Sequence, residues 1–311
     1  MQGKGGQIRP DRPVFVISDL HIGDCSPRDN LSKANREALL DSFLDYVDDD
    51  KGQLVIIGDF FELLRYPLDR ILSRRRPLLD RLARMETIYV PGNHDEDIAH
   101  LIDTGTRHHP FFDQISHAFI RSIGDKRFKF MHGHEVDPLI NTPVQNIGRM
   151  IGSFVYFLEC RHGTCVLSDD VMTNALLETG ERLLALGDWL RGSLTGIWRT
   201  CCGVIPAEKV TLLAREFRTQ RMLGRYQADR TEGLYDIAVV GHTHRAGTFG
   251  DWYFNSGSWT GPTNNFLRIA PGGRIDVFDW DEQGPRVNQT VVAACEPHTC
   301  TKSNLMRRLH G

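Results

Sequence analysis

The feature that most constrains this 311-residue chain is a repeated unit, in which a short apolar run ends directly in polar residues that can bind a metal. Short apolar runs bounded by Gly, Asp or Asn are typical of buried strands. We predict such strands at residues 14–17, 54–57, 87–90, 128–131 and 236–240. Apolar residues at helix-like spacing predict helices at 32–49 and 68–85, so strands and helices alternate in the first part of the chain.

This alternation predicts an α/β layered fold. Further strands are expected at 252–254 and 273–278 without helices between them, so part of the sheet system should be antiparallel. Residues 137–232 are rich in helix signals and poor in strand signals. We therefore predict a catalytic domain formed by residues 1–136 and 233–311, with a helical cap inserted at 137–232.

Five motifs follow the predicted strands. They are Asp19-Leu20-His21, Gly58-Asp59, Gly92-Asn93-His94-Asp95, His132-Gly133-His134 and Gly241-His242-Thr243-His244. Each motif alone is weak, because a Gly-Asp pair is usually a turn and a single His is usually a satisfied polar residue. The carboxyl ends of strands in an open α/β sheet meet at one crevice, where ligands bind. The five motifs together therefore predict one site.

The mixture of Asp, Asn and His suits Mn²⁺, Fe²⁺, Zn²⁺ or Co²⁺. A calcium site would use more oxygen ligands, and a structural zinc site would use Cys and His. Seven candidate ligands are too many for one catalytic metal with an open position, but they fit two metals that share a carboxylate. Two metals about 3.5–4 Å apart stabilise both the attacking and the leaving oxygen at phosphorus. The chemistry predicted is phosphoester hydrolysis.

In this order, the motifs resemble those of the calcineurin-like metallophosphoesterase superfamily, from Asp19 to Gly257. The resemblance implies a four-layer α/β/β/α sandwich with the metals at the strand ends and a hydroxide between them as the nucleophile. It implies that one metal is held by Asp19, His21, Asp59 and His244, and the other by Asp59, Asn93, His132 and His242. Two Mn²⁺ ions are expected, with Fe or Zn as alternatives.

His94 is not a ligand in this scheme. The family resemblance implies that it faces the leaving oxygen, as a general acid or a stabiliser of the transition state. A histidine in that role needs a partner that orients it. Glu62 lies three residues after Asp59, where related protein phosphatases have an acidic residue paired with the same histidine, so we predict a Glu62–His94 contact. The alternative for Glu62 is a carboxylate at the start of a helix.

The residues around Asp19, Asp59, His132 and His242 also resemble a bacterial branch that contains UDP-2,3-diacylglucosamine hydrolase, a pyrophosphatase of the lipid A pathway. Two positions depart from it, since many of those hydrolases have Arg at His94 and Asp at His134. The resemblance implies a phosphoester or diphosphate substrate, lipid-linked or soluble. Apolar cap residues such as Trp189 and Trp198 would either pack between helices or contact acyl chains at the inner membrane face.

Composition excludes several other classes. The net charge is −3 and no basic, aromatic stripe is present, which argues against a nuclease or another nucleic-acid partner. The presence of all seven ligands and His94 argues against a non-catalytic scaffold.

Seven cysteines without a CxxC pair indicate reduced thiols and a cytoplasmic protein. No apolar run reaches ~18 residues, so we predict no membrane span. The basic run Arg74–Arg76 is either exposed or captures a phosphate. The sequence leaves the oligomeric state open.

Overall fold

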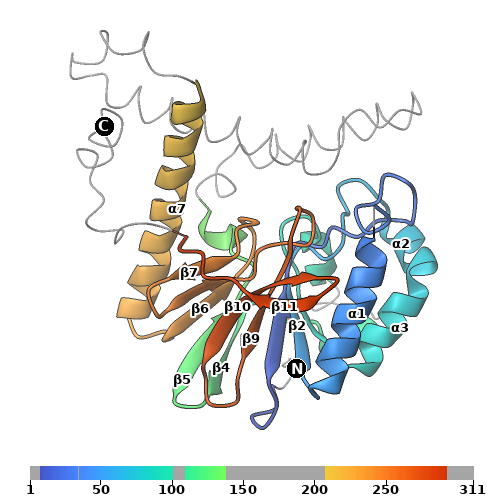
Figure 1. Ribbon diagram of the computed structural model, residues 1–311, viewed down its shortest axis with the longest axis horizontal. Coiled ribbons are helices and arrows are strands. Elements are labelled where there is room, and N and C mark those ends of the chain that lie inside the picture. The colour runs from blue at the N-terminus through green and yellow to red at the C-terminus, as the bar shows by residue number, and fades with distance from the viewer. Residues whose placement is uncertain (1–7, 34, 101–108, 138–206, 293–311) are drawn as a thin grey trace.

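The structure is a computed structural model that describes residues 8–33, 35–100, 109–137 and 207–292. Two mixed β-sheets lie face to face at its centre, as Figure 1 shows, with three helices beside one sheet and a long helix beside the other. Residues 138–206, which hold most of the predicted cap with Trp189 and Trp198, lie outside the described residues. The domain boundaries at 137 and 232 stay a prediction.

The first sheet has the strand order β11-β10-β9-β1-β2-β3. Its parallel part consists of β1 (Val14–Ile17), β2 (Gln53–Ile57) and β3 (Ile88–Val90), all close to the predicted bounds. The antiparallel part consists of β9 (Asn264–Ile269), β10 (Ile275–Asp281) and β11 (Gly284–Val287). The expectation that part of the sheet system is antiparallel is confirmed, although β9 and β11 were not predicted.

The second sheet has the order β4-β5-β6-β8-β7. Its strands are β4 (Phe119–Ile123), β5 (Lys126–Phe130), β6 (Ile237–Val240), β8 (Tyr253–Asn255) and β7 (Gly247–Phe249). Strands β5, β6 and β8 are parallel, and the edge strands β4 and β7 are antiparallel to their neighbours. The second sheet therefore also has parallel strand ends that can carry motif residues.

The helices are α1 (Arg36–Asp49), α2 (Leu68–Arg74), α3 (Arg76–Arg84) and α7 (Ala207–Thr231), with short 3₁₀ turns η1 (Glu96–Ile98), η2 (Pro110–Gln114) and η3 (His134–Val136). Most of the range 68–85 is helical, as predicted, but it forms two helices because the chain leaves helical geometry at Arg75. Pro77 has no N–H to continue the preceding helix and favours the start of a new one. Arg75 is buried against Asp29, so this arginine is neither exposed nor a phosphate ligand.

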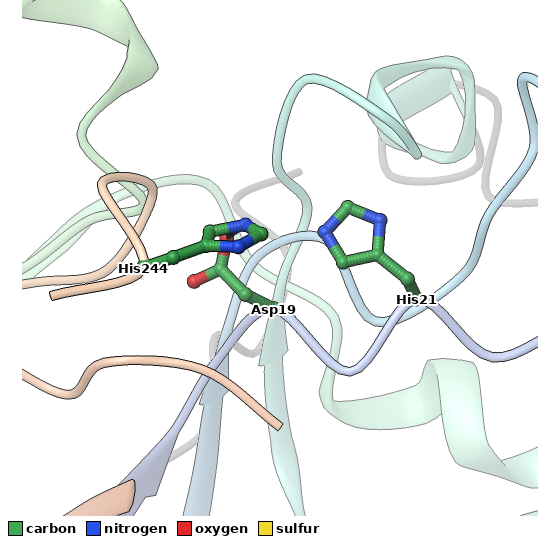
Figure 2. A group of neighbouring side chains, drawn as sticks. All are labelled: Asp19, His21 and His244. Carbon is green, nitrogen blue, oxygen red and sulfur yellow. Dashed lines mark ion pairs between the residues drawn. The ribbon is translucent and has the colours of Figure 1, made fainter. Parts of the chain in front are cut away.

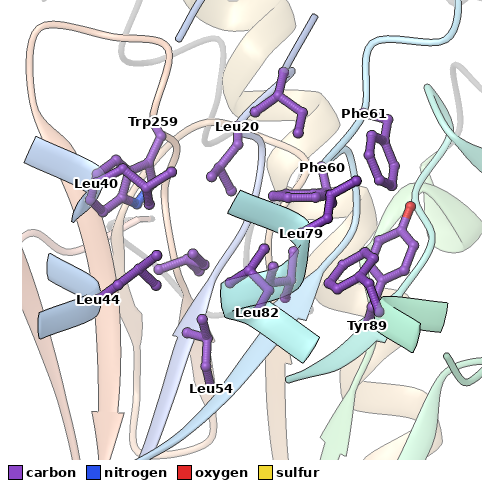
Figure 3. Close-up of a cluster of buried hydrophobic side chains, with 14 of the residues drawn as sticks. Leu20, Leu40, Leu44, Leu54, Phe60, Phe61, Leu79, Leu82, Tyr89 and Trp259 are labelled. Carbon is purple, nitrogen blue, oxygen red and sulfur yellow. The ribbon is translucent and has the colours of Figure 1, made fainter. Parts of the chain in front are cut away.

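Three apolar cores separate the layers. The first lies between helices α1–α3 and the first sheet, and Figure 3 shows Leu44 and Leu82 of the helices near Leu54 of β2. The second lies between the sheets and joins Val16 and Val55 to Phe128 and Val239. The third lies between the second sheet and α7 and includes Val240, Tyr253, Leu223 and Tyr226.

Among the described helices, none is long and apolar enough to cross a membrane.

Candidate metal centre

The five motifs follow the ends of β1, β2, β3, β5 and β6, so both sheets contribute to one site. Backbone hydrogen bonds join neighbouring motif loops: the Asp19 N–H donates to the Gly58 carbonyl, at 3.1 Å, and the His21 N–H to the Asp59 carbonyl, at 2.9 Å. From the second sheet, the Gly241 N–H donates to the His132 carbonyl at 2.9 Å. The loops are therefore fixed to each other as well as to their strands.

Five of the site residues have a left-handed backbone, which is uncommon for any residue other than Gly. Their φ angles lie between 48° and 68°, at Asp19, His21, Asp59, His242 and His244. Such conformations persist where surrounding contacts hold them, and they cluster at functional sites. Each of these turns directs a carboxylate or imidazole to the same edge of the two sheets.

The first group consists of Asp19, His21 and His244, whose ligand atoms lie within 4.8 Å of one another. Figure 2 shows the His244 imidazole next to the Asp19 carboxylate and the His21 imidazole facing them from a different loop. His244 Nε2 is 3.1 Å from Asp19 Oδ1, and the Thr260 hydroxyl lies 3.2 Å from His244 Nδ1. The second oxygen of Asp19 accepts the His242 backbone N–H at 3.0 Å, which links this group to the next.

The second group consists of Asp59, His132 and His242, again with ligand atoms within 4.8 Å of one another, and all three residues are buried. His132 Nε2 is 3.2 Å from Asp59 Oδ2 and 3.2 Å from Asn93 Oδ1. Its other nitrogen donates to the Ile57 carbonyl at 2.9 Å, which leaves Nε2 for the site. The structure thus brings together all seven residues that the sequence proposes as ligands.

Asp59 belongs to the second group and also faces the first. Its Oδ2 is 3.2 Å from His132 Nε2 in the second group and 3.8 Å from His21 Nε2 in the first. Its Oδ1 accepts the His94 backbone N–H at 2.8 Å, which fixes the carboxylate plane. One carboxylate oxygen therefore faces both groups.

Glu62 contacts two histidines of the site. Its buried carboxylate lies 2.9 and 3.0 Å from His94 Nδ1, so the predicted Glu62–His94 contact is present. The same carboxylate also lies 2.8 Å from His21 Nδ1, a contact that the sequence did not suggest. The alternative interpretation of Glu62 as a helix-start residue is wrong, because the next helix begins only at Leu68.

The pKa values of the site show strong coupling between its buried acids and imidazoles. Burial raises the pKa of Asp19, but His244 and His132 beside it lower the pKa to about 2. Burial lowers the pKa of His21, but Glu62 and Asp59 raise it to about 9. Burial also lowers the pKa of His132, while Asp59 and Asp19 raise it to about 10. In the metal-free site the protonated imidazoles thus balance the charge of the carboxylates, and bound divalent cations would take over this role.

A buried atom of the first group supports the same conclusion. His21 Nε2 is buried without a hydrogen-bond partner, while its Nδ1 is held by Glu62. Buried polar atoms without partners are rare in folded proteins and call for an explanation, such as an ion. The donor set and this nitrogen together fit a pair of divalent metal ions.

Three residues of the site carry no signal in the sequence. Asp137 follows η3 and Arg218 lies on α7, and both are buried beside His242. Thr260 contacts His244 from the loop after β8. Asp95, by contrast, belongs to a motif, and its carboxylate accepts the N–H groups of Phe61 at 2.9 Å and Gly92 at 2.6 Å. It ties two motif loops together.

Comparison with known proteins defines the class. The family model for calcineurin-like phosphoesterases matches residues 12–246, and the chain belongs to this family. It is a metal-dependent phosphoester hydrolase. Vacuolar protein sorting 29 from Cryptosporidium parvum has a solved structure similar to this chain, with 15% identity, a TM-score of 0.39, and coverage of 90% of this chain and 96% of that one. A comparison with curated protein sequences gave no match.

Proposed function

We propose that this chain hydrolyses a phosphoester or diphosphate bond with two divalent metal ions bridged by Asp59. The observation that carries the proposal is the position of Asp59 Oδ2 between His21 Nε2 and His132 Nε2. A carboxylate can bind two cations at once, and two metals a few ångströms apart stabilise both oxygens of a displacement at phosphorus.

The first metal position consists of Asp19, His21, Asp59 and His244, and the second of Asp59, Asn93, His132 and His242. Asn93 supports this division because its Oδ1 lies 3.2 Å from His132 Nε2, and a neutral amide adds a ligand without adding negative charge near a phosphate. Mn²⁺ suits the mixture of imidazole and oxygen donors, with Fe or Zn as the alternatives.

When bound, the metals would supply positive charge to the phosphoryl oxygens and an activated water as the nucleophile. The leaving oxygen needs a proton, and a residue of the chain can donate it. His94 Nδ1 is held by Glu62, so its Nε2 is the nitrogen that can reach a leaving oxygen. Burial lowers the pKa of His94, but Glu62 and Asp59 raise it above the usual value, which favours the protonated form that a general acid needs.

The proposed substrate is a nucleotide diphosphate-sugar lipid or a related diphosphate. Support comes from the motif resemblance around Asp19, Asp59 and His242, and the cap at 137–232 would select the rest of the molecule. In this proposal the protein acts in the cytoplasm, with peripheral contact to the inner membrane face through the cap. A soluble phosphodiester is the alternative, and His94 and His134, which depart from the lipid A branch, favour testing it.

The test is hydrolysis by the Mn²⁺-loaded enzyme of four substrates: a monoester, a diester, a nucleotide diphosphate-sugar and UDP-2,3-diacylglucosamine. Faster turnover of the acylated than of the unacylated diphosphate would support a lipid-linked substrate. Turnover restricted to the soluble diester would replace the diphosphate proposal. Absence of turnover of all four substrates by enzyme that holds two Mn²⁺ would contradict the proposed function.

A further inference from the structure

We propose that Asp137 and Arg218 are positioning residues for the second metal position, and that they hold His242 so that it binds through Nδ1. The inference rests on the proposed function, since it takes His242 as a ligand. Neither residue belongs to a motif, and they come from segments 81 residues apart in the chain.

The contact between Asp137 and His242 determines which nitrogen carries the proton. Asp137 Oδ2 lies 2.6 Å from His242 Nε2, and both side chains are buried. An ionised carboxylate only accepts hydrogen bonds, so Nε2–H must be the donor at this distance. In a neutral imidazole the other nitrogen is then a free acceptor. His242 therefore presents Nδ1 to Asp59 and His132.

The other three proposed imidazole ligands are oriented the opposite way. Nδ1 of His21 faces Glu62, Nδ1 of His132 faces the Ile57 carbonyl and Nδ1 of His244 faces Thr260. Each of these three presents Nε2 to the site. His242 alone among the proposed imidazole ligands needs its Nε2 held, and the group that holds it is a buried carboxylate.

Arg218 neutralises the buried carboxylate of Asp137. Its guanidinium pairs with both oxygens of Asp137, with Nε at 3.2 Å from Oδ1 and 3.1 Å from Oδ2. A buried charge without a counterion is very costly, whereas a paired and hydrogen-bonded charge can be kept. Since Arg218 comes from α7, the orientation of a metal ligand depends on how this helix packs against the second sheet.

Carboxylates that hold the far nitrogen of a metal-bound histidine fix its tautomer and raise its basicity, and their removal typically weakens metal binding by about 10–100-fold. We therefore expect the Asp137–Arg218 pair to act on one of the two bound ions. The first metal position contains neither residue and should keep its affinity.

The experiment compares Mn²⁺ binding, by calorimetry and elemental analysis, in the full chain and three variants. Asp137→Asn keeps the shape of the side chain and removes its charge. The double variant Asp137→Asn/Arg218→Gln removes both charges, so that no unpaired buried arginine destabilises the fold. The control Lys129→Gln/Asp229→Asn removes another ion pair between α7 and the second sheet, which does not touch an imidazole. We expect one equivalent of Mn²⁺ to bind about 10–100-fold more weakly in the first two variants. In the control, both equivalents should bind with wild-type affinity.

Nitrogen NMR of the Zn²⁺-loaded protein, with ¹⁵N-labelled histidine, tests the orientation itself. Wild-type protein should show His242 as the Nε2–H form and the other three ligands as Nδ1–H forms. Folded double variant that binds two Mn²⁺ with wild-type affinities, or a wild-type His242 with the proton on Nδ1, would overturn the proposal. If wild-type protein itself bound only one Mn²⁺, the two-metal function would fail instead, so the two failures are distinguishable.

Discussion

The two metal positions are built with the same ligand types but are supported by different surroundings. At the first position, His244 is held by the neutral hydroxyl of Thr260, and the group is partly open, since the His244 side chain is 22% exposed. At the second, all three residues of the group are buried and His242 is held by an ion pair. The difference indicates that His242 is held more firmly than His244, although His21 of the first position is also held by a buried carboxylate, Glu62, and that the first position lies closer to solvent.

The substitution Asp59→Asn should have the largest effect, because Asp59 belongs to both positions. An amide has one oxygen that can bind a metal and carries no charge, so at least one ion should be lost and turnover should fall to background. Elemental analysis and turnover on a generic phosphodiester measure both effects. Asp236→Asn, which removes an exposed carboxylate paired with Arg127, is the control and should keep two ions. Two retained ions with near-normal turnover would show that Asp59 does not bridge.

His94→Ala should separate proton transfer from metal binding at both positions. Both ions should stay bound, since His94 is not a proposed ligand. Its side chain contacts Glu62, and only its backbone N–H contacts the ligand Asp59. Loss of an acid catalyst typically lowers turnover by about 10²–10⁴-fold. His109→Ala is the matched control, because His109 also pairs with a carboxylate, Asp80, at 3.1 Å but lies outside the site. A His94 variant that lost an ion would identify His94 as a ligand.

The motif residues could be predicted from the sequence because each follows its own strand directly. The apolar run before Asp19 or Asp59 defines both the strand and the place where the ligand emerges, which is local information. The residues that support the ligands could not be predicted in this way. In the sequence, Arg218 looks like any other helix residue, because only the packing of α7 brings it to Asp137. Likewise, only the fold brings Asp29 against Arg75, which the sequence left as either exposed or a phosphate ligand.

The same limit explains the missed strand β9, which lies beside β1 near the centre of the first sheet. Its first residues, Asn264 and Asn265, are polar, whereas the strands predicted from the sequence are apolar runs. In the fold both are buried, and the Asn265 amide donates to Asp279 at 2.7 Å while its carbonyl oxygen accepts the Ser258 N–H at 3.3 Å. Those partners come from other segments, so only the tertiary structure reveals why two asparagines can start a central strand.

Glu62→Gln should affect the first position and the general acid together but spare the second position. Oε2 of Glu62 faces Nδ1 of both His21 and His94, and an amide in its place would remove the negative charge that strengthens both hydrogen bonds. We expect one ion to bind about 10–100-fold more weakly, with lower turnover even at saturating Mn²⁺. Calorimetry and steady-state kinetics test this together. Weakening of the same equivalent that Asp137→Asn weakens would contradict the division into two positions.

Metal affinity should rise with pH at both positions. In the metal-free protein the pKa of His21 is raised to about 9 and that of His132 to about 10, so both imidazoles carry a proton near pH 7. Metals bind the deprotonated forms, so each ion must displace a proton. Below the raised pKa values, affinity should increase about tenfold per pH unit at each position. Calorimetry at pH 6, 7 and 8 in buffers of different ionisation enthalpy counts the protons, and a pH-independent affinity would show that these imidazoles are not ligands.

Thr260→Val should have the smallest effect and tests the contrast between the two supporting groups most directly. The substitution keeps the shape of the side chain and removes only a neutral hydroxyl, 3.2 Å from His244 Nδ1. A neutral hydrogen bond is about half as strong as one to a charged group, so first-position affinity should fall by less than about tenfold. Calorimetry beside Asp137→Asn measures the difference. If Thr260→Val weakened Mn²⁺ binding as much as Asp137→Asn does, the charged pair would hold its histidine no more firmly than the hydroxyl does.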